Sequence, residues 1–313
     1  MGDVVHALPA VATLKHSFPG SHLAWLVDPK WTPLLEANPF VDEVIDFDRH
    51  KLSQVLSIRR RLRTPRFDMV VDFQGLVKSA LLASVAGPET IVGYHQAQAR
   101  EPLAALFYSR RILVRARHIV DRHLELATAA GASNILGSFP LPPGVPEGDL
   151  PPGPFVLAAP LAGWGAKQWP LEYYEELAAL LRREMDLPLV LNCSPKGAAM
   201  LRAVSGCRLH ESSVAGLIDA TRRAAAVAGI DSGPLHLAAA LDRPGVAIYG
   251  PTDPERNGPY GGGIEVLRSP SARTSYKRRA KIDPSMRAIT PPMVFAALRQ
   301  RIERAARKKE AGA

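Results

Sequence analysis

The sequence has little cysteine and no long apolar run, and each shortage excludes a class of protein. Its 313 residues include only Cys193 and Cys207, with no CxxC pair, so neither a disulfide framework nor a zinc site is indicated. No apolar run approaches the ~20 residues needed to cross a bilayer. The first residues also lack the charged and apolar regions of a signal peptide. We therefore expect a cytoplasmic protein whose membrane contact is at most peripheral.

Basic residues outnumber acidic residues, and this excess narrows the classes of partner that the protein could bind. The chain carries 39 basic and 30 acidic residues, a formal net charge of +9. Such a balance favours an anionic partner, which is a nucleic acid, an anionic lipid or a phosphorylated substrate. A nucleic-acid surface usually interleaves aromatic with basic residues, and no such stretch occurs, so no nucleic-acid partner is expected. HExxH, GxSxG and paired acidic motifs are absent too, and we expect no metal and no cofactor.

Strand-like and helix-like segments alternate along the chain. Helical patterns at Leu52–Arg63 and Leu171–Met185 lie among apolar strand patterns such as Phe67–Phe73 and Ala225–Ile230. Strands that alternate with helices predict an α/β fold with parallel sheets. The stretch at 139–154 interrupts the alternation, because its seven prolines and three glycines cannot continue a helix or a central strand.

This interruption predicts two Rossmann-like domains on either side of a linker. We expect an N-terminal domain at 1–138, a proline-rich linker at 139–154, a second domain at 155–288, and a basic helix and tail at 289–313. In doubly wound folds, ligands bind outside the carboxyl ends of the strands. Two such domains therefore predict a cleft lined by the carboxyl ends of two sheets.

The segment at 224–241, AAAVAGIDSGPLHLAAAL, is the strongest local signal. A strand ends at Ile230, Asp231, Ser232 and Gly233 make a turn, and a helix of small residues follows. The amides and positive dipole end of such a helix suit a diphosphate, and His236 in the first turn could donate to a phosphate. An ordinary capped helix, with Asp231 or Ser232 as N-cap, explains the same residues.

Two further segments carry charge toward the carboxyl ends of strands. In PLAGWGAKQWP at 160–170, Gly163 and Gly165 predict a flexible loop, and Lys167 could neutralise a diphosphate leaving group. A solvated loop lysine is the simpler interpretation. Asp3 precedes a helical pattern, so a helix N-cap is favoured over a general base on the residues alone.

The first domain is heavily basic. A solvated helix face explains any one of its basic residues, but their number makes a surface for an anionic partner plausible. These residues are Arg59, Arg60, Arg61, Arg63, Lys78, Arg100, Arg110, Arg111, Arg115 and Arg117.

Several long segments resemble the bacterial ADP-heptose:lipopolysaccharide heptosyltransferases of glycosyltransferase family 9, and within them the heptosyltransferase I branch. They are GDVVHALPAV, VVDFQGLVKSALLA, QAREPLAALFYSR, GAKQWP and GIDSGPLHLAAALDRPGVAIYGPTDP, in this order along most of the chain. The resemblance implies the GT-B architecture and an inverting, metal-independent transfer of heptose from ADP-heptose to a Kdo-lipid A acceptor.

The resemblance also implies roles for individual residues. Asp3 matches the general base, and Lys167 would hold the diphosphate. Asp231, Ser232, Gly233 and His236 would form the donor pocket. The anionic acceptor would meet Arg60, Arg61, Arg63, Lys78 and Arg100. Where the family has hydroxyl side chains near the phosphates and an acid at the ribose, this sequence has Ala162, Gly163 and Gly197.

Three alternatives stay open beside this interpretation. One is a related glycosyltransferase that uses another nucleotide sugar or a later, heptosyltransferase II-like acceptor, and another is a GT-B-like sugar-nucleotide epimerase, which needs no acceptor. A basic two-domain nucleic-acid binder is the third. The sequence does not give the oligomeric state. Because a Gly-Asp turn needs a strand that leads into it, we also expect a short strand upstream of Met1.

Overall fold

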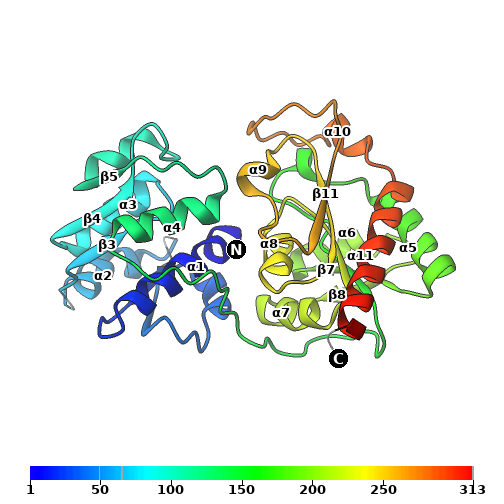
Figure 1. Cartoon of the computed structure of the whole chain (residues 1–313), viewed down its shortest axis with the longest axis horizontal. Coiled ribbons are helices and arrows are strands. Elements are labelled where there is room, and N and C mark those ends of the chain that lie inside the picture. The colour runs from blue at the N-terminus through cyan, green and yellow to red at the C-terminus, as the bar shows by residue number, and fades with distance from the viewer. Residues whose placement is uncertain (49, 65, 312–313) are drawn as a thin grey trace. The chain divides into compact units, whose positions relative to one another are not determined.

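The computed structural model describes residues 1–48, 50–64 and 66–311. The chain divides into two compact units (Figure 1). The N-terminal unit is Asp3–Pro142, and the C-terminal unit is Pro143–Ala313 together with Met1 and Gly2.

The C-terminal unit is built on one parallel sheet of six strands. Their order is β11-β10-β9-β6-β7-β8, and every neighbouring pair is parallel. The strands are β6 (Val156–Ala158), β7 (Leu189–Cys193), β8 (Arg208–Glu211), β9 (Ala226–Ile230), β10 (Gly245–Tyr249) and β11 (Ile264–Arg268). The helices are η3 (Gly165–Lys167), α5 (Leu171–Met185), α6 (Pro195–Leu201), α7 (Val214–Arg223), α8 (Gly233–Ala240), α9 (Pro254–Asn257), α10 (Pro284–Arg287) and α11 (Pro291–Ala311).

The order of these strands reverses between β6 and β9, which are paired at the centre of the sheet. From β6 the chain moves one way through β7 and β8, and from β9 it moves the other way through β10 and β11. The turns that follow β6 and β9 therefore leave the carboxyl edge of the sheet side by side. In doubly wound sheets this switch point is where ligands bind.

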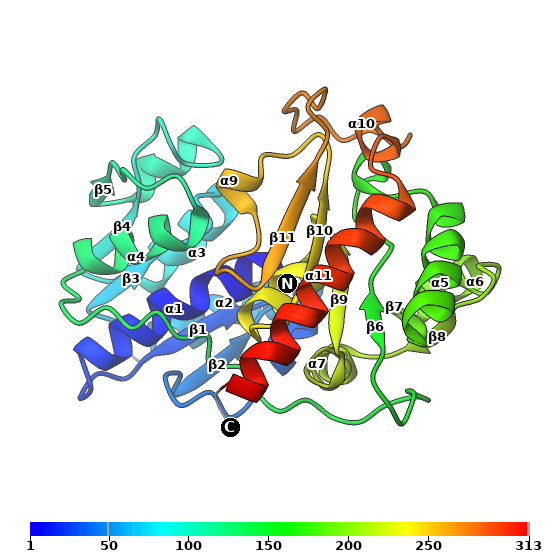
Figure 2. The ribbon, with the colours of Figure 1, turned by 45° about the vertical axis from the view of Figure 1, so that its right-hand side comes forward.

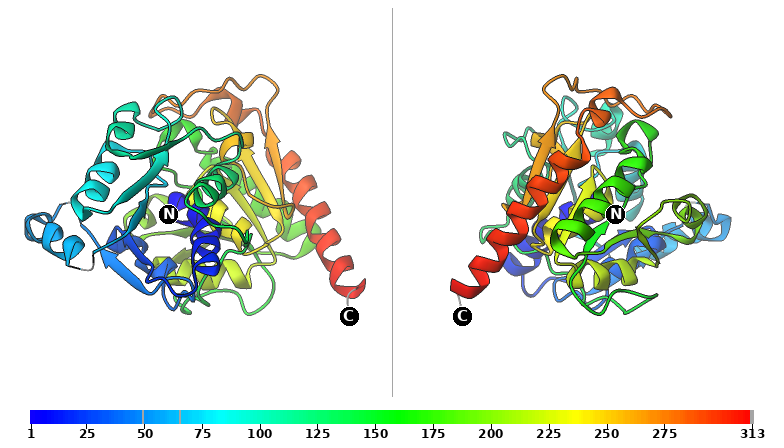
Figure 3. Two further views of the ribbon diagram at one scale, coloured as in Figure 1. Left: turned by 60° about the vertical axis from the view of Figure 1, so that its left-hand side comes forward. Right: turned by 90° about the vertical axis from the view of Figure 1, so that its right-hand side faces the viewer.

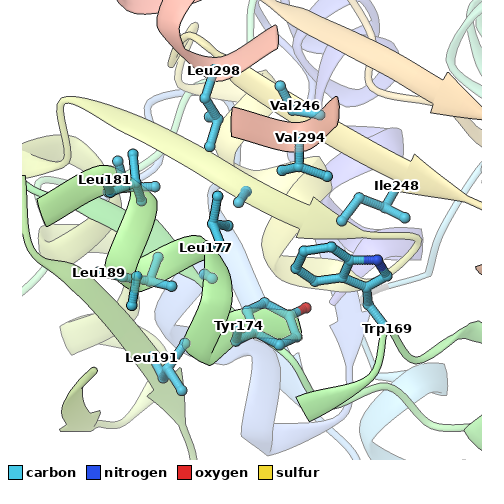
Figure 4. Close-up of a cluster of buried hydrophobic side chains, with 14 of the residues drawn as sticks. Trp169, Tyr174, Leu177, Leu181, Leu189, Leu191, Val246, Ile248, Val294 and Leu298 are labelled. Atoms are coloured by element: carbon cyan, nitrogen blue, oxygen red, sulfur yellow. The ribbon is translucent and has the colours of Figure 1, made fainter. Parts of the chain in front are cut away.

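The core of the C-terminal unit lies between the sheet and the helices α5 and α11. These two helices contact each other, and they pack on β7, β9 and β10 (Figure 2). Figure 4 shows Trp169 and Tyr174 at one end of this core. Both side chains are fully buried, and the Trp169 Nε1–H donates to the carbonyl of Ile289 at 2.8 Å. This bond ties the chain just beyond η3 to the approach to α11.

The N-terminal unit holds two smaller parallel sheets, β1-β2 and β3-β4-β5 (Figure 3, left). Its strands are β1 (Ala24–Val27), β2 (Glu43–Asp46), β3 (Met69–Val71), β4 (Thr90–Tyr94) and β5 (Arg110–Ile112). Its helices are α1 (Gly2–Ser17), η1 (Pro29–Leu34), α2 (Leu52–Arg63), α3 (Val77–Ala86), η2 (Pro102–Phe107) and α4 (Ile119–Ala129). Among the described residues, β1 and β3 each pair on one side only. The expected strand upstream of Met1 lies outside this sequence and stays a prediction.

The proline-rich stretch contains no helix or strand, and hydrogen bonds attach its two ends to different units. The Asn38 amide donates to the carbonyl of Pro140 at 3.0 Å, within the N-terminal unit. Farther along, the Val145 N–H donates to the carbonyl of Ala215 at 3.1 Å. Glu147 accepts bonds from the Ser213 hydroxyl and amide, which lower the pKa of its carboxyl group.

Among the sequence expectations, the helices α2 and α5 begin and end where predicted. The flexible loop expected at Gly163 and Gly165 is only partly correct. Gly165–Lys167 forms the 3-10 helix η3, and a Cβ on Gly165 would collide with the carbonyl of Ala280. Glycine is therefore required for close packing at this position.

Candidate active site

The site in the C-terminal unit begins with a pair of charges from the two turns at the switch point. Lys167 lies at the end of η3, after β6, and Asp231 directly follows β9. The Lys167 Nζ lies 3.0 Å from Asp231 Oδ2, although the two residues are 64 positions apart in the chain. Because β6 and β9 pair in the centre of the sheet, folding brings these two turns together. The spacing in the sequence does not reveal the pair.

His236 completes the group from the first turn of α8. Its Nε2 lies 3.5 Å from Asp231 Oδ1, and both residues are buried. Burial by itself raises the pKa of Asp231, but His236 and Lys167 outweigh it and lower this pKa to about 2. Asp231 is therefore an ionised carboxylate at neutral pH. It holds the Lys167 ammonium and the His236 ring at the start of α8.

Ser232 is the N-cap residue of α8, yet its side chain makes no capping bond to the helix. Its Oγ is buried and has no hydrogen-bond partner among the described residues. The first amides of α8 and its positive dipole end lie at this position. A buried hydroxyl beside helical N–H groups can bind the oxygens of a phosphate. Gly233 begins the helix, whereas the sequence analysis places it at the end of the turn.

Trp164 belongs to this group, although sequence analysis does not select it. The Lys167 Nζ lies 4.7 Å from the centre of the Trp164 ring, a cation–π geometry. Its only signal in the sequence is a position three residues before the lysine. The stacked ring and the Asp231 carboxylate together fix the ammonium in one place.

Asp3 lies in the N-terminal unit, in the first turn of α1. The predicted N-cap role is wrong, because α1 begins at Gly2 and Asp3 lies inside the helix. The Asp3 Oδ2 accepts a bond from Arg100 Nη1 at 2.9 Å, and both side chains are about half exposed. An exposed pair of this kind contributes roughly 0–1 kcal/mol to stability, so it orients the carboxylate more than it stabilises the fold.

Asp72, at the carboxyl end of β3, organises the turn beside Arg100. Its Oδ1 accepts the amides of Gln74 and Gly75, and its Oδ2 accepts the hydroxyls of Ser79 and Tyr108. Burial raises the pKa of Asp72, and these hydrogen bonds offset part of the rise. The carbonyl of Gly75 in turn accepts the amide of Glu101 at 2.9 Å. Asp72 thereby fixes the segment that carries Arg100, a role that sequence analysis did not assign.

The structure does not bring the five predicted acceptor residues together. Arg61 lies 4.0 Å from Glu43, the first residue of β2, and the Arg63 Nε donates to Val85 near the end of α3. Both contacts lie near the amino ends of the strands.

Lys78 and Arg100 instead follow the carboxyl ends of β3 and β4. The α3 residues between Lys78 and Val85 alone span ~10 Å at 1.5 Å per residue. Arg60 is exposed in the last turn of α2, beside Arg61.

Two other features bear on what the site can hold. In the described part of the chain, no three histidine, cysteine or acidic side chains are grouped as metal ligands. None of the helices at 1–48, 50–64 and 66–311 is long and apolar enough to cross a membrane. Gly197, where the family resemblance implies an acid, is buried in α6 against Leu161 and Cys193. No side chain fits there without displacing Leu161.

A buried charge group beside a helix N-terminus, at the switch point of a parallel sheet, is where α/β proteins of this class commonly bind a ligand that carries phosphate. The family model of glycosyltransferase family 9 (heptosyltransferase) matches residues 55–286. Lipopolysaccharide heptosyltransferase 1 of Pseudomonas aeruginosa is 32% identical over 286 residues, which cover 83% of this chain and 79% of that protein.

Two solved structures are similar along nearly the whole chain. Escherichia coli heptosyltransferase WaaC with ADP has a TM-score of 0.77 and 26% identity, with 96% of each chain covered. E. coli ADP-heptose lps heptosyltransferase II has a TM-score of 0.79 and 25% identity, with 97% of this chain and 96% of that one covered. This chain therefore belongs to glycosyltransferase family 9, the heptosyltransferases, and the predicted α/β fold of the GT-B class is confirmed.

Proposed function

We propose that this enzyme transfers heptose from ADP-heptose to a Kdo-lipid A type acceptor, with inversion, during synthesis of the lipopolysaccharide inner core. The observation that carries the proposal is the Lys167–Asp231–His236 group at the N-terminus of α8. Two comparisons support it: the WaaC structure contains ADP, and its relative is named for ADP-heptose. We place the enzyme in the cytoplasm, peripheral to the inner membrane that carries such acceptors.

The proposed donor half lies in the C-terminal unit, over residues 155–288. The α8 amides, Lys167, Ser232, Gly233 and His236 bind the diphosphate of ADP-heptose, and Asp231 keeps the lysine and histidine in position. As the bond between the anomeric carbon and the diphosphate oxygen breaks, negative charge grows on the departing ADP. Preorganised N–H donors and an ammonium stabilise such charge most effectively in a buried site.

The proposed acceptor half lies in the N-terminal unit, over residues 1–138. Asp3 takes the proton of the acceptor hydroxyl while that oxygen attacks the anomeric carbon, so one C–O bond forms as the other breaks. Arg100 holds the Asp3 carboxylate and donates from its exposed side to the anionic acceptor. We assign the same task to Lys78, which follows the carboxyl end of β3, whereas Arg60, Arg61 and Arg63 would contact more distant acceptor groups.

Product analysis with ADP-heptose and Kdo-lipid A tests the proposal. We expect ADP release that depends on the acceptor, together with a lipid product heavier by one heptose. Release of the sugar without acceptor, or conversion to an isomeric sugar nucleotide, would contradict a transferase of this kind.

A binding measurement tests the donor half by itself. Lys167→Ala removes a charge-assisted hydrogen bond, worth roughly 1.5–3 kcal/mol, and should weaken ADP binding at least tenfold by calorimetry. Arg304→Ala removes an exposed basic residue from α11 in the same unit and serves as the control. Equal ADP affinity in both variants would remove Lys167 from the donor site.

A second candidate is an enzyme that adds heptose to an acceptor that already carries heptose. The fold favours neither, since the TM-scores to WaaC and to heptosyltransferase II are 0.77 and 0.79. Turnover with heptosylated Kdo-lipid A, compared with the unmodified acceptor, decides between them.

A further inference from the structure

A strongly basic segment lies next to the donor half and has no part in the function described so far. We call residues Lys277–Lys281 the cationic strap, because four of its five residues are basic. These are Lys277, Arg278, Arg279 and Lys281. No acidic residue occurs between Glu265 and Asp283. The four basic side chains are exposed, and no described carboxylate forms an ion pair with any of them.

Backbone hydrogen bonds fix the strap on the turn that carries Lys167. The Ala166 N–H donates to the carbonyl of Arg279 at 3.0 Å, and the Asp283 N–H donates to the carbonyl of Ala166 at 3.3 Å. The missing side chain of Gly165 leaves room for the carbonyl of Ala280. The strap is therefore held one residue away from Lys167 and does not depend on its own side chains for its position.

The approach to the strap is fixed at a second point on the same edge of the sheet. The Ser275 N–H donates to the carbonyl of Pro251 at 2.7 Å, in the turn that follows β10. Because β10 pairs with β9, this turn neighbours the one that carries Asp231. Residues 275–283 thus connect the turns after β10 and β6, which flank the start of α8.

Charge balance at the site indicates what the strap could do there. The Lys167 ammonium is already neutralised by the Asp231 carboxylate at 3.0 Å. The α8 N-terminus adds only about half a positive charge. A diphosphate brings more than one negative charge, so this group alone leaves much of the anion without a counter-charge. The cations of the strap have no carboxylate partner among the described residues, and they start from the adjacent turn.

A pair of buried hydroxyls points to a polar ligand at the same edge. Thr252 follows Pro251, is 2% exposed, and its Oγ1 has no hydrogen-bond partner among the described residues. The Ser232 Oγ, in the turn after β9, is likewise buried and has no hydrogen-bond partner among the described residues. A buried hydroxyl without a partner is destabilising, and a bound phosphate oxygen would supply the missing hydrogen bond.

We propose that the cationic strap is a second anion-binding element of the donor site and supplies the counter-charge for the diphosphate of the nucleotide sugar. This inference rests on the proposed function for the identity of the nucleotide. It assigns the strap to a diphosphate and not to an anionic membrane surface.

Calorimetry with ADP and with inorganic pyrophosphate tests the strap. The variant K277Q/R278Q/R279Q removes three charges and leaves the backbone bonds intact. The control R304Q/R307Q/K308Q removes three exposed charges from α11. We expect the strap variant to bind both ligands about tenfold more weakly than the control, because it lacks three charge interactions with the anion. The gap should narrow at high salt, and adenosine binding should not change.

Three results would overturn the assignment. One is equal pyrophosphate affinity in the strap and control variants, and another is no binding of either ligand by the wild-type protein. The third is unchanged ADP affinity together with lost sedimentation on vesicles of anionic phospholipid, which would make the strap a membrane contact. If the wild-type protein binds pyrophosphate but not ADP, the proposed nucleotide is wrong, and the pyrophosphate comparison alone decides the role of the strap.

Discussion

The two units differ in how their parallel strands are joined and in how deeply those strands are buried. In the C-terminal unit six parallel strands form one sheet, and β7, β9 and β10 are buried along their whole length. In the N-terminal unit the strands form two separate sheets, and β1 and β3 are only partly buried. The proposed donor residues accordingly follow strands that are fully buried, whereas Asp3 and Arg100 form a half-exposed pair. Charges should therefore interact strongly in one unit and be screened by salt in the other.

The largest effect should come from the N-terminal unit, where Asp3 and Arg100 form the half-exposed pair. Asp3→Asn should lower turnover roughly 10²–10⁴-fold, because it removes the proposed general base. ADP affinity and the unfolding curve should stay close to wild type, since Asp3 is exposed and lies outside the donor unit. Steady-state kinetics with calorimetry on the same sample checks this. Wild-type turnover in Asp3→Asn would limit Asp3 to its contact with Arg100.

A matched pair of core substitutions should show the difference in packing directly. Leu177 on α5 is 0% exposed, whereas Leu26 on β1 is only half-buried. Leu177→Ala should cost about 2–5 kcal/mol of unfolding free energy, the usual range for a closed core. Leu26→Ala should cost less, about 1–2 kcal/mol. Urea unfolding followed by circular dichroism measures both, and equal costs would show that the two units are packed alike.

The buried charge group predicts a pH dependence for the C-terminal unit. Asp231 has a pKa of about 2, below its ordinary value of 3.8, so folding favours its ionised form. This contribution, about 2 kcal/mol, is complete above about pH 5 and is lost progressively as the pH falls to about 2 and below. The stability gap between wild type and Asp231→Asn should shrink over that window. A gap that is constant between pH 2 and pH 6 would contradict the assignment.

The smallest effect should distinguish basic residues near the carboxyl ends of the N-terminal strands from those near the amino ends. Lys78 follows the carboxyl end of β3, and Arg61 lies near the amino end of β2. Lys78→Ala should raise the acceptor KM severalfold at low salt, and Arg61→Ala should raise it less. Donor KM should not change in either variant. A larger effect at Arg61 would place the acceptor toward the amino ends of the strands.

Sequence patterns predict the strands that are buried on both faces and the helices that bury one apolar face. The buried strands of the C-terminal unit are continuous apolar runs, and α5 repeats its apolar residues at helical spacing, so both are visible locally. The strands β5 (RRI) and β8 (RLHE) were missed because they lie at sheet edges and carry charges there. In β4, Gly93 resembles a turn signal, but a side chain there would collide with the ring of Tyr108. The reason for this glycine is a tertiary contact.

The candidate site shows the same division between local and long-range information. The Asp231–His236 segment is a contiguous motif, and the sequence predicts its turn and helix, although the helix already begins at Gly233. The partners of its charges are distant in the chain, since Lys167 is 64 residues from Asp231 and Arg100 is 97 residues from Asp3. A basic composition likewise cannot show that Arg61 and Lys78 lie at opposite ends of the strands. The arrangement of the strands determines both the charge partners and the positions of the basic residues, and residue composition does not reveal that arrangement.

The stacking of Lys167 on Trp164 gives the protein a natural optical probe. Of its four tryptophans, Trp169 is fully buried, and Trp164 lies partly exposed beneath a lysine ammonium. Indole emission responds to nearby charge, so an anion that draws the ammonium away from the ring changes the fluorescence of Trp164. Trp169, in the core below, reports on unfolding instead. With Trp25 and Trp31 replaced by phenylalanine, one emission spectrum would follow both the occupancy of this site and the integrity of the fold around it.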